Sequence, residues 1–422
     1  MNVLLIGAGG REHALAWKIA RSPLLQKLYI APGNPGTAGC GINVDIGVNN
    51  FPALAQLVRR ESIHLVVVGP EEPLANGICD FFRDQDDLDW VGIIGPDRSG
   101  ARLEGSKDFA KQFMSRHGIP TARHKTFTAA TEVEAEAYIH SLTPPYVLKA
   151  DGLAAGKGVV ILHDPDQAVK EIRQMFEGKF GAAGSKVVVE EYLTGIELSV
   201  FVLTDGDSYL LLPEAKDYKR IGEGDTGPNT GGMGAVSPVP FADPAFMEKV
   251  RQRVIEPTIN GLKQDQIGYK GFIFFGLMNV NGDPFVIEYN VRMGDPESEV
   301  VIPRIDSDLL DLFKAVKEGR LRDKTIEINP EAAATVMLVS GGYPGSYEKG
   351  LPISGLDNIE DGLVFHAGTL RKDGQLLTNG GRVLALTALH HSWKLALSHA
   401  YEMAGQAQFD GMYYRKDIGF DL

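Results

Sequence analysis

Short apolar runs that end in glycine and proline recur through the first hundred residues of the sequence. Such runs, each followed by a loop rich in these two residues, occupy residues 3–6, 28–30, 63–68 and 91–94. Strands that alternate with helices and end in such loops are typical of an open, doubly wound parallel sheet, which binds ligands at the carboxyl ends of its strands. The pattern therefore predicts an α/β fold for this region.

The chain is too long to be organised around one hydrophobic core. Its 422 residues predict two to four domains, and its content of 44% hydrophobic and 23% charged residues is ordinary for a globular protein. A compact unit of strands and a helix is expected over residues 121–190, and longer strands over 195–300 favour a larger antiparallel sheet. The pattern restarts near residue 327, so we expect a further small mixed α/β domain and an α+β organisation overall.

The formal net charge of -13 limits the classes of partner. An acidic surface repels nucleic-acid backbones and anionic membranes, so we expect neither as a partner. Cys40 and Cys79 are the only cysteines and cannot form a secreted disulfide framework. The first apolar run is too short for a signal peptide, and no stretch approaches the roughly 20 apolar residues of a membrane span. These features predict a cytoplasmic location.

A glycine turn between a strand and a helix at residues 7–13 is suited to binding an anion, because the first N–H groups of a helix lack partners within it. The turn departs from a dinucleotide fingerprint, since Glu12 stands where the last glycine is required. The second strand ends in Ala-Pro-Gly at 31–33, without an acid for a ribose hydroxyl. The turn therefore disfavours NAD, and a tight turn that serves packing alone is the alternative.

A second glycine loop follows Lys149 and contains another lysine, Lys157. Its N–H groups and the two cations predict a loop that closes over a triphosphate. It is not a Walker A loop, because the spacing between Gly152 and Gly156 is one residue short and Gly158 replaces the required Ser or Thr. It also runs from strand to strand. The alternative is a mobile hairpin.

Polar residues alternate along an expected strand at 286–292. Alternate residues of a strand share a face, so Glu288, Asn290 and Arg292 are expected together, with Tyr289 and Val291 turned away. Carboxylate and amide oxygens suit Mg²⁺, and the arginine would contact the phosphate being transferred. The following turn would place Asp295 at the same edge. A solvated strand face with an ion pair is the alternative.

Two further segments suggest ligand contacts but are ambiguous alone. The extended segment 190–197 could offer its backbone to an adenine edge and Glu197 to ribose hydroxyls, although solvated surface acids would look the same. The loop 225–235, rich in Gly, Asn and Thr, suits close approach to a small ligand, and a flexible loop is the alternative.

These segments occur in the order of an ATP-grasp fold, and further motifs resemble one family of that group, glycinamide ribonucleotide synthetase. The motifs are GGREHA (9–14), APGNPGTA (31–38), VGPEEPL (68–74), LEGSK (103–107), KADGLAAGKGV (149–159), DTGPNTGGMGA (225–235), RMGDPE (292–297), GGYPG (341–345), FHAGT (365–369), TNGGRVL (378–384) and RKDIG (415–419). The resemblance covers essentially the whole chain.

The resemblance implies a pre-ATP-grasp substrate domain, an ATP-grasp domain pair and a C-terminal domain. The implied ranges are 1–102 for the N-terminal domain, 103–120 with 191–326 for the central domain, 121–190 for the lid and 327–422 for the C-terminal domain. The implied reaction of de novo purine biosynthesis joins glycine to 5-phosphoribosylamine through glycyl phosphate, with ATP and Mg²⁺ (or Mn²⁺) as cofactors. Its partners would be these small molecules alone, with the chain acting as a monomer.

The resemblance also implies roles for individual residues. The implied catalytic residues are Arg292, Lys219 and Asp295, and the implied metal ligands are Glu288 and Asn290. The implied nucleotide-binding residues are Lys107, Lys149, Gly152, Gly156, Lys157, Gly158, Glu190, Glu191, Leu193 and Glu197. The implied substrate-binding residues are Gly10, Arg11, Glu12, Gly33, Asn34, Pro35, Gly69, Pro70, Glu71, Asp225, Asn229, Thr230, Gly231, Gly232 and Met233.

The sequence departs from the family pattern at a few positions. Glu299 stands where many relatives have Gln, and Tyr218 stands within a segment that often reads Asp-His-Lys. The strand at 272–278 lacks the acid that many ATP-grasp enzymes have there, which leaves the number of metal ions open. The remaining alternatives are another ATP-grasp ligase or carboxylase, an NAD-dependent oxidoreductase and a non-catalytic nucleotide sensor.

Overall fold

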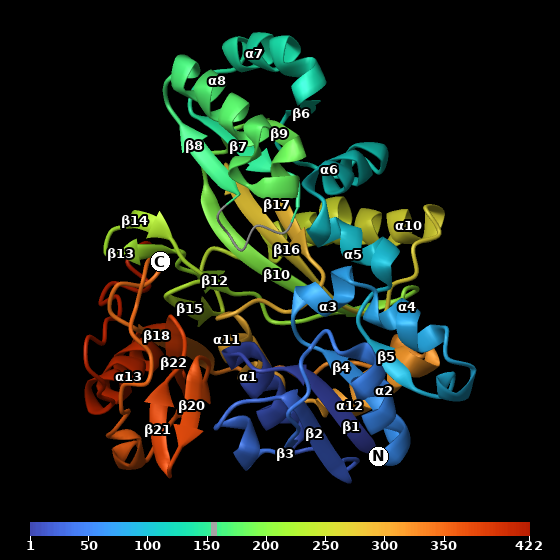
Figure 1. Ribbon diagram of the computed structural model, residues 1–422, viewed down its shortest axis with the longest axis vertical. Helices are drawn as coiled ribbons and strands as arrows, with labels where there is room; N and C mark the ends of the chain where they lie inside the picture. Colours follow the sequence, from blue (N-terminus) through green and yellow to red (C-terminus); the bar gives the residue numbers. More distant parts are fainter. Residues whose placement is uncertain (153–157) are drawn as a thin grey trace.

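The structure is a computed structural model, and it describes residues 1–152 and 158–422. In Figure 1 the lid sheet lies at the top, the N-terminal parallel sheet at the lower right and the C-terminal strands at the lower left. The long antiparallel strands β10, β16 and β17, with bounds given below, lie between them.

The early apolar runs form a parallel sheet with strand order β3-β2-β1-β4-β5, so the expected open parallel sheet is confirmed. Its strands are β1 (Asn2–Gly7), β2 (Lys27–Pro32), β3 (Ile42–Asn43), β4 (Ile63–Val68) and β5 (Gly92–Ile94). Val3 and Leu5 pack into one core and Leu4 and Ile6 into another, because helices cover both faces.

The helices on this sheet come mostly from the same region of the chain. They are α1 (Gly10–Ile19), α2 (Phe51–Arg60), α3 (Glu71–Ala75), α4 (Ile78–Arg83), α5 (Arg98–Gly105) and, from much later in the sequence, α12 (Leu309–Glu318). The Lys317 ammonium of α12 donates to the Trp90 carbonyl at 2.6 Å, just before β5. The N-terminal sheet is therefore covered in part by a helix that follows the central sheet in the chain.

The central sheet is antiparallel, with order β11-β10-β16-β17. Its strands are β10 (Ile196–Thr204), β11 (Tyr209–Leu211), β16 (Gly271–Val280) and β17 (Asp283–Asn290). The helices that pack near it are α6 (Lys107–Arg116), α9 (Pro244–Val250) and α10 (Glu256–Gln264). Val200, Phe201 and Val202 of β10 are fully buried, so both faces of the sheet are covered. The larger antiparallel sheet expected here is confirmed.

The lid has a sheet of its own, with order β6-β9-β7-β8. Its elements are β6 (His124–Thr128), α7 (Glu132–Ser141), β7 (Tyr146–Ala150), β8 (Val159–Leu162), α8 (Pro165–Gln174) and β9 (Lys186–Glu191). Leu148, Ile139 and Ile172 belong to a small core that is separate from the other two. The glycine loop runs from β7 to its antiparallel neighbour β8, as expected.

The C-terminal sheet combines two parts of the chain in the order β12-β15-β18-β22-β19. Its strands are β12 (Lys216–Asp217), β15 (Gly234–Ser237), β18 (Ala332–Val339), β19 (Leu363–His366) and β22 (Arg382–His390). Nearby lie the hairpins β13 (Arg220–Gly222) with β14 (Thr226–Asn229) and β20 (Thr369–Lys372) with β21 (Gln375–Thr378), and the helices α11 (Ser298–Val301) and α13 (Trp393–Gln406). The glycine-rich loop 225–235 therefore connects a surface hairpin to a strand of this sheet.

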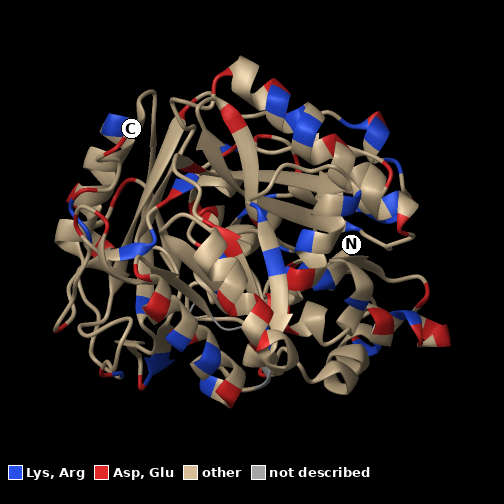
Figure 2. Ribbon diagram, turned by 90° about the horizontal axis from the view of Figure 1, so that it is seen from above, with Lys and Arg blue, Asp and Glu red and all other residues tan. Residues whose placement is uncertain are grey.

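Charged residues of both signs are interspersed along the elements seen in Figure 2. Within the described residues, no helix combines the length and the apolar character that crossing a membrane would need.

Candidate active site

The start of α1 is built around the Glu12 side chain, which lies against the glycines at the ends of β1 and β4. The Glu12 carboxylate accepts from Gly9 N–H at 2.6 Å and pairs with Arg11 Nε at 2.6 Å. A Cβ at Gly7 or at Gly69 would lie 2.4 or 2.2 Å from this side chain. Glu12 was expected to bind substrate, but its carboxylate is engaged in shaping the turn.

Arg11 and Glu71 connect the N-terminal sheet to the turn that follows β17. Arg11 Nη1 donates to the Met293 carbonyl at 3.2 Å, and its N–H lies 3.4 Å from Asp295 Oδ2. The Glu71 carboxylate lies 3.3 Å from Arg292 Nε. Burial alone would raise the pKa of Glu71, but the charges of Arg292 and Arg11 lower it. Motifs far apart in sequence therefore meet here.

Arg292 does not lie on β17, because the strand ends at Asn290. Its guanidinium turns to two carboxylates from the N-terminal side, Glu71 and Glu104, with Glu104 Oε1 at 2.7 Å. Glu104 also accepts from Val291 N–H at 2.8 Å, which fixes the backbone just before Arg292. Arg292 was expected to share a strand face with Glu288 and Asn290. It instead lies in a bend after the strand, where it pairs with Glu71 and Glu104.

Asn34 joins the second N-terminal glycine loop to the C-terminal domain. Its Nδ2 donates to the carbonyls of Ala8 and His366 at 2.9 and 2.8 Å, and its Oδ1 accepts from two N–H groups of its own turn. Gly33 before it has φ 73, and a Cβ there would lie 2.3 Å from Asn43 Oδ1. The buried Asn34 side chain therefore holds the loop, whose backbone remains the part able to face a ligand.

The lysines expected at the triphosphate lie together beneath the lid. Lys149 Nζ lies 3.0 Å from Glu190 Oε2 and donates to the Ile287 carbonyl at 3.2 Å. Lys107 Nζ donates to the Gly152 carbonyl at 2.9 Å. Burial lowers the pKa of Lys107, and the nearby Glu288 charge opposes this. Both lysines therefore lie near Glu288, the proposed metal ligand.

Lys111 is a site residue that the sequence did not reveal. It is buried, and its Nζ lies 3.0 Å from the Glu190 carboxylate that Lys149 also contacts. Burial lowers the pKa of Lys111 to about 8, although the Glu190 charge raises it. A lysine one helical turn after Lys107 was the available signal, but surface lysines show the same spacing.

A second charged cluster near Glu288 is formed around Lys219. Lys219 Nζ lies 2.8 Å from Glu197 Oε2 and 3.9 Å from Asp217 Oδ1. Burial disfavours charge on Lys219, but Asp217, Glu197 and Glu288 raise its pKa well above the usual value. Lys219 therefore carries a positive charge among the carboxylates of Asp217, Glu197 and Glu288. Asp217 is another residue that the sequence did not single out.

Glu288 and Asn290 form the donor pair on the central sheet. Tyr289 between them is buried and its hydroxyl lies 2.9 Å from Thr258 Oγ1, whereas Glu288 and Asn290 are partly exposed. Among the described residues, no group of three or more His, Cys, Asp or Glu could by itself hold a metal. A carboxylate and an amide oxygen nevertheless fit Mg²⁺, which commonly takes few protein ligands and completes its shell with phosphates and water.

The 230–232 part of the glycine-rich loop packs against the Asp295–Pro296 turn. Gly231 N–H donates to Tyr343 Oη at 2.9 Å, and Gly232 has φ 114 with Pro296 Cδ 2.3 Å from where a Cβ would stand. Thr230 Oγ1 donates to the Lys219 carbonyl at 2.8 Å. The contact with Thr230 thereby holds Lys219 beside the 230–232 turn.

Arg382 of the TNGGRVL motif holds the same assembly from the C-terminal domain. Its Nη1 donates to the carbonyls of Gly231 and Asp295, the latter at 2.7 Å. Its Nη2 lies 3.1 Å from Asp295 Oδ1. Met233 is fully buried, and its side chain belongs to the core rather than to the site. Its expected substrate contact could come only from its backbone.

Glu297 and Glu299, close to Asp295 in the sequence, have raised pKa values. Glu299 is fully buried, and neither carboxylate oxygen has a hydrogen-bond partner among the described residues. Burial and the Asp295 charge raise the pKa of Glu299 well above its usual value. Burial and the Asp217 charge raise the pKa of Glu297 to about 7. Burial of Glu299 beside Asp295 therefore favours the protonated form of its carboxyl group.

The remaining expected site residues have the following positions. The Glu191 carboxylate accepts from the backbone N–H of Arg123 at 2.9 Å and from Arg123 Nε at 2.6 Å. Leu193 is partly exposed in the connection from β9 to β10. Gly10 opens α1, Pro70 precedes α3, Pro35 is partly exposed, and Asn229 ends the exposed strand β14. Gly158 accepts from Ala150 N–H at 2.8 Å, and Gly156 and Lys157 fall outside the described residues.

Comparisons with known proteins agree with this arrangement. Three models described as phosphoribosylglycinamide synthetase match the chain, the N domain over residues 1–104, the ATP-grasp (A) domain over 105–298 and the C domain over 333–421. A phosphoribosylamine–glycine ligase of Chlorobaculum tepidum is 47% identical and covers 99% of each chain. One from Vibrio cholerae is 47% identical and covers 100% of this chain and 98% of its own.

Solved structures show the same likeness. The crystal structure of phosphoribosylamine–glycine ligase from Thermotoga maritima has a TM-score of 0.86 at 35% identity, and covers 99% of this chain and 100% of that one. A biotin carboxylase domain from Hydrogenobacter thermophilus, in complex with MgADP, has a TM-score of 0.73 at 18% identity over 98% of this chain and 91% of its own, and shows a shared fold alone. The chain therefore belongs to the phosphoribosylglycinamide synthetase family, whose N, ATP-grasp and C domains it carries in that order.

Proposed function

We propose that the protein catalyses the ATP-dependent ligation of glycine to 5-phosphoribosylamine, which gives glycinamide ribonucleotide, ADP and phosphate in de novo purine biosynthesis. The observation that carries the proposal is the contact of Lys149 with the Ile287 carbonyl, which brings a lid cation beside Glu288. Relatives named for this reaction are similar over the full length of the chain.

ATP is proposed to lie between the lid sheet and the central sheet. Lys107 and Lys149 would contact its phosphates, since both ammonium groups are held near Glu288. The glycine loop, with Gly152, Gly156, Lys157 and Gly158, would cover the triphosphate with N–H groups and a further cation. Adenine would lie along the backbone of residues 190–193, and Glu197 would accept from the ribose hydroxyls.

Magnesium, or manganese in its place, would be held by Glu288 and Asn290. When bound, the ion neutralises charge on the phosphates and so favours phosphoryl transfer. Lys219 lies near Glu288 and would stabilise the negative charge that develops on the acyl oxygen when the amine attacks. Arg292, fixed by Glu71 and Glu104, would contact the transferred phosphoryl group.

The chemistry follows from the weakness of a carboxylate as an acyl donor. The glycine carboxylate attacks the γ-phosphorus of ATP, which forms glycyl phosphate and releases ADP. The amine of phosphoribosylamine then attacks the acyl carbon, a carbon–nitrogen bond forms, and phosphate leaves with loss of an amine proton. Positioning and charge neutralisation suffice for both steps, and closure over the site keeps water from the acyl phosphate.

The ribosyl phosphate is proposed to bind where the N-terminal loops meet the 230–232 turn. Gly10, Gly33 and Gly69 allow close approach of backbone, and Arg11 supplies a buried cation there. Asp295 lies within reach of Arg11 N–H and is fixed by Arg382, so it is placed to orient the substrate amine. Asn34, Pro35, Pro70, Glu71, Asn229, Thr230, Gly231 and Gly232 would line or support this side.

We further propose that the chain acts as a monomer in the cytoplasm, where ATP and the small-molecule substrates are available. We also propose that the chain has four domains, with boundaries at 1–102, 103–120 with 191–326, 121–190 and 327–422. Light scattering would test the oligomeric state, since a stable dimer would contradict the first point.

The decisive assay measures ADP release with glycine and phosphoribosylamine together and with each alone. We expect ADP only when both are present. ADP release with bicarbonate or with a different amino acid would favour another ATP-grasp reaction. Binding of NADH without Mg·ATP would favour an oxidoreductase, and Mg·ATP binding without turnover would favour a nucleotide sensor.

A further inference from the structure

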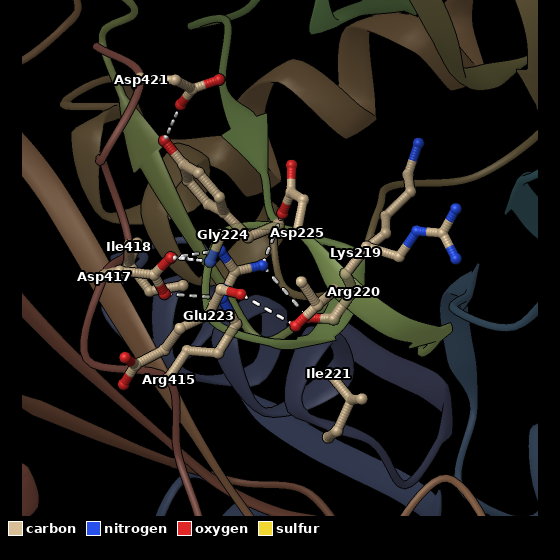
Figure 3. A network of polar contacts seen from close by, with 12 residues as sticks. Lys219, Arg220, Ile221, Glu223, Gly224, Asp225, Arg415, Asp417, Ile418 and Asp421 are labelled. Carbon is tan, nitrogen blue, oxygen red and sulfur yellow. Dashed lines mark hydrogen bonds and ion pairs between the residues drawn. The ribbon is translucent and has the colours of Figure 1, made fainter.

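Arg415, within the RKDIG motif, lies fully buried beside the hairpin that leads into the glycine-rich loop. Figure 3 shows its guanidinium between Asp417 and Asp225. Nε and Nη2 donate to the two Asp417 oxygens at 2.8 Å each, and Nη1 donates to Asp225 Oδ1 at 2.7 Å and to the Arg220 carbonyl at 3.1 Å. One side chain thus contacts both β13 and the turn after it.

Asp417 strengthens this junction from the other side. Its Oδ2 also accepts from Gly224 N–H at 2.7 Å, so the Arg415–Asp417 pair contacts three points of the hairpin segment 220–225. Within this segment Asp225 has a positive φ of 54, a conformation that is uncommon for residues other than glycine. A non-glycine residue in the left-handed region is retained only where its surroundings hold it.

The segment that carries Arg415 is itself anchored. Ile418 N–H donates to Tyr401 Oη of α13 at 3.0 Å. Tyr413 Oη donates to the Ile221 carbonyl at 3.0 Å, and Tyr218 Oη donates to Asp421 Oδ1 at 2.9 Å. The segment 413–421, which α13 contacts through Tyr401, therefore supports the hairpin.

The hairpin in turn determines where two parts of the site lie. Its first strand begins one residue after Lys219, and its second ends one residue before Thr230. Thr230 N–H donates to the Lys219 carbonyl at 2.7 Å, which closes the base of the hairpin beside the site. A shift of residues 220–229 would consequently move both Lys219 and the 230–232 turn that packs on Pro296.

We propose that Arg415 is a positioning residue that holds the 220–229 hairpin, and with it the 230–232 turn, over the site for the ribosyl phosphate amine. Asp225 then serves as the acceptor for Arg415, a role that replaces the direct substrate contact implied by the family resemblance. This proposal rests on the proposed function. It assigns to the C-terminal domain a role in binding the phosphoribosylamine and leaves ATP binding to the lid.

The test compares the Michaelis constants of wild type with those of four variants. Phosphoribosylamine is formed in the assay from ribose 5-phosphate and ammonia, and the affinity for glycinamide ribonucleotide is measured by calorimetry as a second readout. For Arg415→Gln we expect a rise of about tenfold or more in the KM for phosphoribosylamine and a similar loss of product affinity, with the KM for ATP within about twofold of wild type.

Arg415→Lys keeps the charge but cannot contact Asp417 with two parallel bonds and reach Asp225 as well, so its KM should lie between those of wild type and Arg415→Gln. Lys416→Ala removes the exposed neighbouring charge and is the matched control, with wild-type constants expected. Asp225→Asn keeps the shape of the acceptor and is the alternative variant if Arg415→Gln fails to fold. It should shift the same KM in the same direction.

The outcomes separate the two proposals. Absence of glycine-dependent ADP release in wild type would overturn the proposed function itself. Wild-type activity with an unchanged phosphoribosylamine KM in the Arg415 and Asp225 variants would overturn the positioning role. So would equal changes in both KM values together with a lowered thermal midpoint, because that result describes general loss of structure.

Discussion

The ammonium of Lys149, on the lid strand β7, lies 3.2 Å from the carbonyl oxygen of Ile287, on the central strand β17. Ile287 directly precedes Glu288, so the contact brings the lid lysine to the proposed metal ligand. Two sheets with separate cores meet at this point. The proposed nucleotide site depends on this meeting.

Glu288→Gln tests the carboxylate at that point. The substitution keeps shape and volume but removes the charge that would hold Mg²⁺, so we expect kcat to fall by about two orders of magnitude or more. The thermal midpoint should stay near that of wild type. Glu134→Gln, on the exposed face of α7, is the control with normal activity. Wild-type turnover in Glu288→Gln would refute the metal assignment.

Gly10→Ala tests the close packing at the start of α1. A Cβ there would lie 2.2 Å from Glu299 Oε1, so the buried acid and the turn around Asp295 must shift. We expect a loss of about 1–3 kcal/mol in the free energy of unfolding and a raised KM for phosphoribosylamine. The control is Gly39→Ala, where a Cβ would meet no atom within 4 Å. Equal behaviour of the two variants would contradict this packing.

Glu299→Gln tests the raised pKa of the buried Glu299 carboxyl group. Its folded pKa is raised above the usual 4.5 by burial and by Asp295, and the facing Arg382 opposes this. Above pH 4.5 the folded state therefore holds a proton that the unfolded state has lost, so this group reduces stability as pH rises.

Glutamine has no such titration, and its amide can donate to Asp295. At pH 8 we expect Glu299→Gln to be more stable than wild type by on the order of 1 kcal/mol, with full activity. Denaturation at several pH values should show the difference narrowing toward pH 5. If the difference in the free energy of unfolding between Glu299→Gln and wild type did not depend on pH, the raised pKa of Glu299 would be contradicted.

The imidazoles of His13 and His366 make the N-terminal and C-terminal contact sensitive to acid. Burial lowers the pKa of His13 to about 3 and that of His366 to about 4, and His366 N–H donates to His13 Nδ1 at 2.7 Å. Below pH 6.5 the unfolded chain therefore binds protons that the folded protein excludes, and stability falls.

The loss should approach about 1.4 kcal/mol per pH unit for each histidine between pH 6 and 5. Thermal midpoints measured from pH 7.5 to 5 would show it. His13→Asn retains an acceptor for the His366 N–H and removes one titrating group, so its midpoint should fall less steeply with acid. An equally steep fall in this variant would exclude the contribution of His13.

The sequence was sufficient to predict those strands and turns that depend on residues close together in the chain. The apolar runs and glycine turns of the first hundred residues predicted the parallel sheet, because burial and positive φ restrict the residues at those positions. The alternation around Tyr289 predicted which side of β17 faces inward. The glycine loop between β7 and β8 was likewise readable from its composition.

Contacts between distant residues could not be predicted in this way. Arg415 and Asp225 are 190 positions apart, and nothing in either segment indicates that the aspartate is already paired. The family resemblance implied a substrate contact for Glu12, and the hydrogen bond that its carboxylate accepts from Gly9 N–H is visible only in three dimensions. Strands β12 and β15 gave no indication that they would join the C-terminal sheet, since pairing partners follow from packing rather than from composition.

A crystal structure with Mg²⁺, glycine and a non-hydrolysable ATP analogue would test the central claim most directly. We expect the triphosphate between β7 and β17, with Lys107 and Lys149 in contact with its oxygens and the metal bound to Glu288 and Asn290. A nucleotide bound at the β1–α1 glycine turn, or a metal bound away from Glu288, would contradict the account.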